Sequence, residues 1–375
     1  MMNLALDGAV HYHYDNFPPK QLNYEKLMPM LLRATDAIAR YDQMLKNMHN
    51  SEILLAPLRN QEAVISSRME GTVSTMDEIL KYEADHQNGD SDSTENVRSE
   101  VIETILYQRS LKLAQQALID GYPISQSMIK SLHQRLLSFG RGAGKSPGEF
   151  KIEQNYLADQ AKQKILFVPI SPEKLQDGLD ELFAYIKSSS APSLLKAAIS
   201  HLEFEALHPF KDGNGRIGRM LITLMLWQAK TISEPHFYIS AYFEENKDRY
   251  IDTMRKVSET GDWDEWCLFF LEAVENQAIS NLSIAENIRA LYEDMKKTFA
   301  DILSSKWSVT ALDFVFTNPI FRNNKFTSQS GIPQATAARF TRTMIDNNIL
   351  ITLEEAAGRK PALYSFEPLL KLVRV

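Results

Sequence analysis

The chain has 375 residues, of which 44% are hydrophobic, and its formal net charge at pH 7 is −7. This length predicts two or three folded domains. The acidic balance excludes a surface that is basic throughout, as nucleic-acid partners require. The single cysteine, Cys267, excludes a disulfide framework and a cysteine metal site, and it favours a reducing cytoplasm. We expect no membrane span and no signal peptide, because the apolar runs are short and the N-terminus lacks the required pattern.

Hydrophobic periodicity predicts a mainly helical chain. Residues 1–20 are polar and contain proline, which predicts an extended arm. The stretch 86–93 is the clearest flexible loop. Residues 148–169 carry short apolar and aromatic runs around a polar turn, which predicts a β-hairpin. Helical periodicity covers the segments near 25–48, 55–82, 96–120, 125–138, 173–188, 192–207, 214–229, 245–258 and 263–303.

The last seventy residues differ from the rest. We expect a helix over 311–316, a helix-turn-helix over 326–347, and two strands, 349–353 and 362–366, around the basic tip 358–360. From Lys306 onward there are nine Lys or Arg residues and five Asp or Glu residues, so this part is +4 and the rest is −11. Two uses fit this winged-helix pattern: protein contact or dimerisation, and DNA binding. The residues expected to contact DNA are Gln334, Thr336, Arg339, Arg342 and the tip.

The most informative segment is 208–219, His-Pro-Phe-Lys-Asp-Gly-Asn-Gly-Arg-Ile-Gly-Arg. A glycine-rich turn that opens a helix directs several backbone N–H groups at one anion. Asp212 beside that turn suggests Mg²⁺, which takes a few carboxylate oxygens together with phosphate oxygens. Arg216 and Arg219 lie three positions apart, close enough to bind the same phosphate chain. With His208 before the turn, the segment predicts phosphoryl or nucleotidyl transfer. The alternative is a histidine-capped turn with a solvated helix start.

This segment resembles the signature of the Fic family, HPFx[DE]GNGRxxR, and it matches every fixed position, with Lys211 in the variable place. Fic enzymes usually transfer AMP from ATP to a protein hydroxyl. The resemblance implies that His208 is the general base, a role that suits a side chain whose ordinary pKa is about 6.5. It also implies that Asp212 holds Mg²⁺ against the α- and β-phosphates of ATP.

The resemblance assigns nucleotide binding to the first turns of the helix after the signature. Arg219 would bind the γ-phosphate, and Arg216 would support the phosphates or brace the loop. The amides near Gly213 would cradle the phosphates, with the Asn214 side chain assisting. Phe210 is expected to anchor the loop in the core, and His201, upstream, to be a packed structural histidine. The expected nucleotide-binding residues are Gly213, Asn214, Gly215, Arg216, Ile217, Gly218 and Arg219, with Asn246 and Tyr250 as candidates for adenine contact.

Residues 66–71, Ser-Ser-Arg-Met-Glu-Gly, resemble a second Fic element, the inhibitory motif [ST]xxxE[GN], through Ser66, Glu70 and Gly71. A helix would end at Glu70, and Gly71 would adopt the left-handed cap conformation. The glutamate would then pair with Arg219 in the place of the γ-phosphate. The alternative is an ordinary surface helix end. The resemblance also implies that the hairpin at 148–169 is a flap that aligns the target by strand addition, rather than a simple connection.

We therefore predict a mainly α, Fic-fold enzyme that adenylylates Tyr, Thr or Ser hydroxyls of a target protein or of itself, uses ATP and Mg²⁺, and is inhibited by Glu70. Removal of AMP, transfer of another nucleotide, and a DNA-binding regulator with a nucleotide-sensing Fic domain are the alternatives. A homodimer is compatible with the sequence. The predicted domains are 1–95 (helical, with the inhibitory helix), 96–275 (catalytic), 276–304 (connecting helix) and 305–375 (winged helix).

Overall fold

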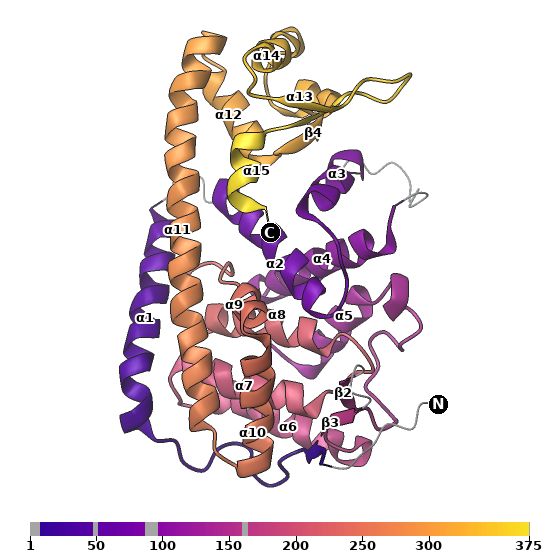
Figure 1. Cartoon of the computed structure of the whole chain (residues 1–375), viewed down its shortest axis with the longest axis vertical. Coiled ribbons are helices and arrows are strands. Elements are labelled where there is room, and N and C mark those ends of the chain that lie inside the picture. Colours follow the sequence, from indigo (N-terminus) through magenta and orange to yellow (C-terminus); the bar gives the residue numbers. More distant parts are fainter. Residues whose placement is uncertain (1–7, 48–51, 87–96, 160–163, 375) are drawn as a thin grey trace.

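The structure is a computed structural model, and it describes residues 8–47, 52–86, 97–159 and 164–374. Within these residues the chain is mainly helical with two small sheets, as predicted (Figure 1). The first eight α-helices are α1 (Tyr24–Lys46), α2 (Glu52–Met69), α3 (Met76–His86), α4 (Ser99–Ile119), α5 (Gln126–Leu136), α6 (Pro172–Ser188), α7 (Ser193–Leu207) and α8 (Asn214–Gln228). The others are α9 (Ser240–Glu245), α10 (Lys247–Thr260), α11 (Asp264–Leu303), α12 (Ser308–Thr317), α13 (Asn323–Gln329), α14 (Gln334–Asp346) and α15 (Glu367–Val373).

The helix bounds differ from two of the predicted segments. The segment expected over 55–82 forms α2 and α3, because Gly71 has a φ of +80° and the amide of Thr72 returns to the carbonyl of Ser67, which closes α2. The segment expected over 245–258 corresponds to α10, which begins at Lys247 because the backbone leaves the helical conformation at Asn246, between α9 and α10. The loop predicted at 86–93 lies, after His86, outside the described residues, as does the arm before residue 8.

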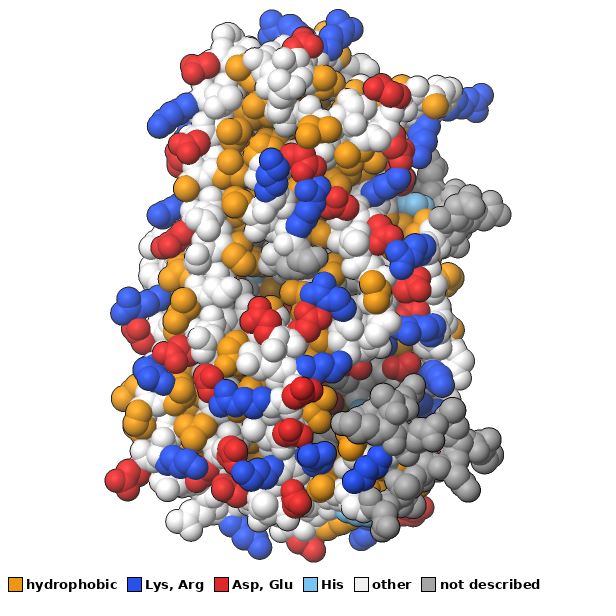
Figure 2. Space-filling view, viewed as in Figure 1, with side chains coloured by type: hydrophobic (Ala, Val, Ile, Leu, Met, Phe, Trp, Pro, Cys, Tyr) orange, Lys and Arg blue, Asp and Glu red, His pale blue; other side chains and the backbone are white. Residues whose placement is uncertain are grey.

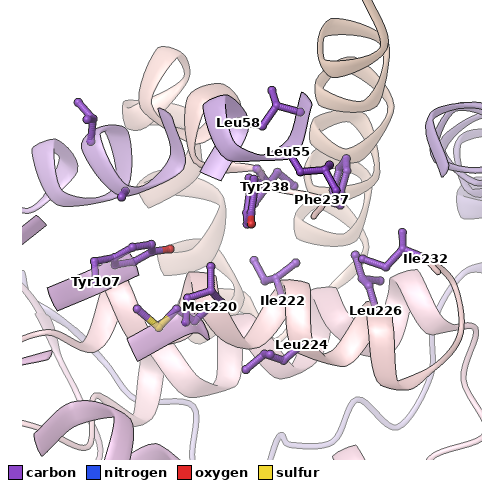
Figure 3. Packing of buried hydrophobic residues seen from close by; sticks show 14 of the residues in the cluster. Leu55, Leu58, Tyr107, Met220, Ile222, Leu224, Leu226, Ile232, Phe237 and Tyr238 are labelled. Carbon is purple, nitrogen blue, oxygen red and sulfur yellow. The ribbon is translucent and has the colours of Figure 1, made fainter. Parts of the chain in front are cut away.

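Helix α8 lies at the centre of the helices that surround the signature. Every residue from Asn214 to Leu226 is buried, and α7 and α8 pack along each other. Figure 3 shows Tyr107 of α4, Leu58 of α2 and Tyr238 lying across from Met220 and Ile222 of α8. Such a closely packed helix holds its N-terminal turn in a fixed position, where the signature residues lie.

Helix α11 packs both against the helices around the signature and against the helices of the C-terminal part. It has 40 residues, or about 60 Å of length, and it runs along the molecule beside α1 (Figure 1). The helix continues without a break through residues 275 and 276, where the sequence predicts a domain boundary. The division into four domains therefore stays a prediction. None of the described helices is long and apolar enough to cross a membrane.

A three-stranded sheet lies beside the signature, formed by β1 (Val10–His11), β2 (Leu157–Asp159) and β3 (Lys164–Val168) in the order β1-β3-β2. The antiparallel pair β2 and β3 is the predicted hairpin, although its tip, 160–163, lies outside the described residues. The N-terminal arm adds β1 parallel to β3 and is anchored by buried contacts. The Tyr12 hydroxyl donates to Glu203 at 2.6 Å, and the His13 ring lies 2.8 Å from the same carboxylate.

The C-terminal part has the element order α12, β4 (Ile320–Arg322), α13, α14, β5 (Ile351–Glu354), β6 (Leu363–Ser365) and α15. Its sheet is antiparallel in the order β4-β6-β5. The helices expected over 326–347 and the two strands that follow are therefore present, with the turn between β5 and β6 at Ala357–Lys360.

This C-terminal part packs against the helices near the N-terminus. The Gln61 side chain of α2 donates to the carbonyl of Val373 at 2.8 Å. Arg322 contacts Asp85 at 2.6 Å, and Arg374 contacts Asp77 of α3 at 2.8 Å. Ion pairs of both polarities join the two parts, because Lys81 of α3 also pairs with Glu354 of β5.

Candidate active site

The signature begins where α7 ends. His208 caps α7 in the left-handed conformation, with a φ of +45°, which directs the chain sharply away from the helix axis. The Asn155 amide holds the turn by donating to the carbonyls of His208 and Phe210, at 3.0 and 3.1 Å. The Phe210 ring is fully buried, as predicted, and stacks on His133 at a centroid distance of 3.8 Å. The loop is therefore tied down on both sides of Pro209.

His208 is neutral at neutral pH in this setting. Burial and then the nearby Lys151 ammonium lower the pKa of His208 to about 4. Its Nδ1 lies 3.3 Å from the carbonyl of Glu205, which can only accept, so Nδ1 carries the proton. The lone pair is then on Nε2. A neutral imidazole with a free Nε2 is the form that accepts a proton in general base catalysis.

The first turn of α8 forms an anion site. Gly213 precedes the helix with a φ of +79°, a conformation that favours glycine. The Asp212 carboxylate accepts from the Gly213 amide at 2.6 Å. The first amides of any helix lack intrahelical acceptors, so those of Asn214, Gly215 and Arg216 are directed outward beside His208. The Asn214 side chain makes two hydrogen bonds to the backbone of Phe210, at 2.9 and 2.8 Å, and so braces the loop.

Two buried arginines lie beside this turn. Arg216 has its Nη2 3.6 Å from Asp212, while its Nε and Nη1 have no hydrogen-bond partner among the described residues. Burial lowers the pKa of Arg216. Unsatisfied guanidinium donors in the interior are costly, and an oxyanion would satisfy them.

Arg219, in contrast, donates hydrogen bonds to residues in the last turn of α2 and directly after it. Its Nε donates to the Ser66 hydroxyl at 2.8 Å, and its Nη2 donates to the Ser66 carbonyl at 2.9 Å and to Glu70 at 2.8 Å. Burial would lower the pKa of Arg219, but Glu70, Tyr250 and Glu205 together raise it above its ordinary value. Burial alone would raise the pKa of Glu70, but the charge and hydrogen bond of Arg219, together with Arg216 and His208, lower it.

Glu70 also lies against the anion site itself. A β-carbon at position 215 would collide with the Glu70 carboxylate and with the Arg219 guanidinium. Glycine at this position therefore permits the close approach of a carboxylate to the first turn of α8. The residues that the sequence assigns to inhibition, Ser66, Glu70 and Gly71, and those that it assigns to catalysis meet in one place.

The last turn of α2 is fixed by two more contacts. Arg68 forms a bidentate pair with Glu244 of α9, at 2.7 and 2.6 Å. Lys247 donates to the carbonyl of Met69 at 3.1 Å. Farther up α2, the buried Glu62 accepts hydrogen bonds from Tyr107 and Ser240. The helix is thus held along its length against α4 and α9.

Several residues that support the site belong to no sequence motif. Buried His133 lies with Nε2 2.9 Å from the carbonyl of Asp212, and its Nδ1 accepts from the amide of Gly148. Lys151 donates to the carbonyl of Leu207 at 3.0 Å, and burial lowers its pKa to about 7. Burial also raises the pKa of Glu205, behind Arg219, to about 8. Isolated polar residues in helices and loops carry no spacing signal, so only the fold could bring them here.

The remaining predicted site residues lie behind the anion site. Ile217 is fully buried, and Gly218 faces the side chains of Glu205 and His201. The Tyr250 hydroxyl lies 2.8 Å from Nε2 of buried His201, and Asn246 donates to the carbonyl of Tyr242 at 3.0 Å. Contact of Asn246 and Tyr250 with adenine stays a prediction.

The donors fit Mg²⁺ only together with phosphate. In the part of the chain that the structure describes, no group of three His, Cys, Asp or Glu residues could hold a metal ion. Asp212 is the carboxylate at the loop, and its side chain is about 37% exposed. One carboxylate is a typical protein contribution where phosphates supply further ligands.

Two family models match the chain. One describes the Fic/DOC family and covers residues 123–226, and the other describes the N-terminal region of the Fic/DOC family and covers residues 28–116. The chain belongs to the Fic/DOC family. The two matches include the inhibitory segment and the signature up to α8, so both halves of the site lie within the family regions.

Curated relatives within the family are similar at modest identity. The protein adenylyltransferase fic-1 of Caenorhabditis elegans is 29% identical over 109 residues, which are 28% of this chain and 20% of that protein. A probable protein adenylyltransferase of Aquifex aeolicus is 23% identical over 215 residues, which are 56% of this chain and 58% of that protein. The chain thus spans about a fifth of the length of the nematode relatives that it matches.

Solved structures of Fic proteins share the fold. A Fic family protein from Desulfovibrio desulfuricans has a TM-score of 0.58 at 15% identity, over 93% of this chain and 98% of that one. A Fic domain containing signaling protein from Bacteroides thetaiotaomicron has a TM-score of 0.54 at 18% identity, over 68% of this chain and 96% of that one. At this identity the likeness concerns the fold alone.

Proposed function

We propose that this chain is a protein adenylyltransferase that transfers AMP from ATP to a Tyr, Thr or Ser hydroxyl of a target protein or of itself. The observation that carries the proposal is the juxtaposition at the start of α8: a neutral His208 with a free Nε2 lies beside outward-directed amides and the unpaired donors of Arg216. The names of the matched relatives support the same activity.

The reaction assigns each residue one task. Nε2 of His208 takes the proton of the target hydroxyl as its oxygen attacks the α-phosphorus of ATP. The bond from the α-phosphorus to the bridging oxygen breaks, and pyrophosphate leaves. The amides of the first α8 turn and the Arg216 guanidinium stabilise the charge on the phosphates. Arg219 binds the γ-phosphate once Glu70 has released it, which orients the α-phosphorus toward His208.

Asp212 would hold Mg²⁺ together with the phosphates. When bound, the ion neutralises phosphate charge and orients the chain of phosphates. Asp212 already accepts one hydrogen bond from the Gly213 amide, which fixes its direction at the mouth of the loop.

We also propose that Glu70 inhibits the enzyme. Its carboxylate pairs with Arg219 and lies against Gly215, where a phosphate of ATP would have to lie. Arg219 cannot bind both anions with the same donors. ATP that binds beside Glu70 therefore lacks the contact between Arg219 and its γ-phosphate. Its α-phosphorus is then misplaced for attack.

The hairpin β2–β3 is proposed as the flap that receives the target. In the described part of the sheet, β2 pairs only with β3, so its other edge is open to another strand. An extended target segment added there would run close to the signature, because Asn155, just before β2, holds the carbonyl of His208.

For the C-terminal part we propose a winged-helix domain used for contact with protein, including the docking to α2 and α3 described above. Its element order of helix, strand, helix, helix and hairpin supports the domain assignment. DNA binding through α14 is the second candidate, since Gln334, Arg339 and Arg342 are exposed on that helix.

The test is transfer of label from ATP. The full chain, with Glu70→Gly to release the site, is incubated with Mg²⁺ and ATP labelled on the α- or on the γ-phosphate. We expect label on protein only from the α-position, and none with the additional change His208→Ala, which should still bind ATP. Label from the γ-position, or near-normal transfer without His208, would overturn the mechanism. Release of AMP from modified protein, without transfer, would favour the de-adenylylating alternative.

A further inference from the structure

A separate cavity lies where the C-terminal part meets the N-terminal helices. It has a volume of about 300 Å³ and is lined by α2, α3, α4, the end of α12, β4 and α13. This cavity shares no lining residue with the signature loop. Its charged lining residues are Arg59 of α2, Glu83 of α3, Arg109 and Lys112 of α4, and Lys325 of α13.

Four of these five charges are positive. Within the described ranges, neither Arg109 nor Lys112 has a carboxylate at ion-pairing distance, and Lys325 is only 7% exposed with its ammonium donating to the neutral Asn318 amide at 2.6 Å. Burial lowers the pKa of Lys325. Burial raises the pKa of Glu83, although all four cations oppose the rise. The exposed Arg109 and Lys112 thus bring positive charge to the cavity beside the buried ammonium of Lys325, with no carboxylate at ion-pairing distance from any of the three in the described ranges.

We propose that this cavity is a binding site for a small phosphate-bearing anion. Clustered cations repel one another, and an anion with several oxygens would turn that repulsion into attraction while accepting hydrogen bonds from Arg and Lys donors. The size of the cavity selects a small ion or the phosphate end of a nucleotide. A nucleic-acid duplex is too large to enter a cavity of about 300 Å³.

The bound anion would connect parts of the chain that are far apart in sequence. Arg59 lies on α2 two turns before Ser66, while Lys325 belongs to the C-terminal part. An anion between them ties α2 and α4 to α13 and so stabilises the junction. This inference concerns a second site and does not depend on the transfer reaction.

The experiment is a calorimetric titration of the full chain with pyrophosphate, at constant ionic strength set with chloride. Hydrogen exchange with and without pyrophosphate then locates the site, which is needed because pyrophosphate can also bind the signature loop. We expect saturable binding with protection of residues 80–84, 108–112 and 318–325. The double variant Arg109→Gln/Lys112→Gln should weaken binding at this site about tenfold or more and abolish that protection. The matched control Lys174→Gln/Lys297→Gln, which removes two exposed cations elsewhere, should not.

Lys325→Met provides a second test through the buried cation, and it should also weaken binding while the protein stays folded by circular dichroism. Repeating the exchange measurement with ADP distinguishes the source of the phosphate. Protection at lower ADP than pyrophosphate concentrations would identify a nucleotide, and the reverse a free ion. Absence of protection in the three segments, or equal affinity of the double variant and the control, would overturn the proposal.

Discussion

The carboxylate of Glu70 lies 2.8 Å from the guanidinium of Arg219, although 149 positions separate the two residues in sequence. The Arg219 side chain is 2% exposed and that of Glu70 is 31% exposed. The arginine is thus deeply buried, while its partner approaches from the open side of the site. Such a contact can be broken from outside without unfolding the core.

Glu70→Gly should raise the rate of AMP transfer, on the order of 10²-fold, because it frees Arg219 for the γ-phosphate and corrects the position of the α-phosphorus. The same variant should lose about 1–3 kcal/mol of stability without nucleotide, since a buried arginine is left unpaired and the exposed side of the pair was already screened. ATP should therefore raise the melting temperature of the variant more than that of the wild type.

Radiolabel transfer and thermal unfolding with and without ATP measure both effects. Glu78→Gly is a suitable control, because Glu78 pairs with Arg98 away from the site. If Glu70→Gly matched this control in transfer and in its thermal response to ATP, residues 66–71 would be an ordinary helix end.

The Arg68–Glu244 pair should act on the same equilibrium from a distance. Glu244→Ala leaves Glu70 in place but removes the bidentate contact that holds the last turn of α2 to α9. We expect transfer to rise, by less than about tenfold, because a partly exposed bidentate pair contributes about 1 kcal/mol. Glu245→Ala removes a neighbouring exposed carboxylate and serves as the control. Equal transfer rates for the two variants would show that the pair does not restrain α2.

The sequence predicted most of the helices and the chemistry of the signature, because both depend on local patterns. Periodicity located α8 and α11, and the spacing of the signature placed His208, Asp212, Asn214, Arg216 and Arg219 within twelve residues. The helix end at Glu70, with Gly71 in the left-handed conformation, was predicted from the resemblance, and α2 ends at Met69, whereas the predicted helical periodicity continued over 55–82. Apolar residues continue on both sides of the break, so periodicity alone predicts one continuous helix there.

What sequence reasoning could not predict depends on contacts between distant segments. His133 and Lys151 support the loop from α5 and from the region before β2, and neither belongs to a motif. The docking of Arg322 and Arg374 on α3 likewise arises only when the two ends of the chain meet. Single charged residues are usually solvated. No sequence pattern therefore distinguishes the few that form contacts within the fold.

Four of the nine Lys and Arg residues of the C-terminal part are paired or buried within the chain. Arg322, Lys360 and Arg374 are in ion pairs and Lys325 is buried. Figure 2 shows acidic and basic side chains interspersed over the visible face rather than a single basic patch. We therefore expect no retarded complex of the full chain with duplex DNA at micromolar protein and physiological salt, since affinity there needs several phosphate contacts. A shift that weakens with salt and disappears in Arg339→Ala/Arg342→Ala would instead establish DNA binding through α14.

The pH dependence of transfer should report the burial of His208. The base works in its neutral form, so activity is lost as pH falls through its pKa, and burial with Lys151 places that pKa near 4 rather than 6.5. Glu70 raises the pKa of His208, so the released Glu70→Gly enzyme should have it no higher. We expect kcat/KM for a fixed target to stay level between pH 8 and pH 5.5, without the halving near 6.5 that an exposed histidine would give.

Lys151→Met should move the acid limb to higher pH, because it removes the positive charge beside the ring. An acid limb centred near 6.5 in the Glu70→Gly enzyme, or one that Lys151→Met moved downward, would mean that His208 is not the buried, neutral base seen here.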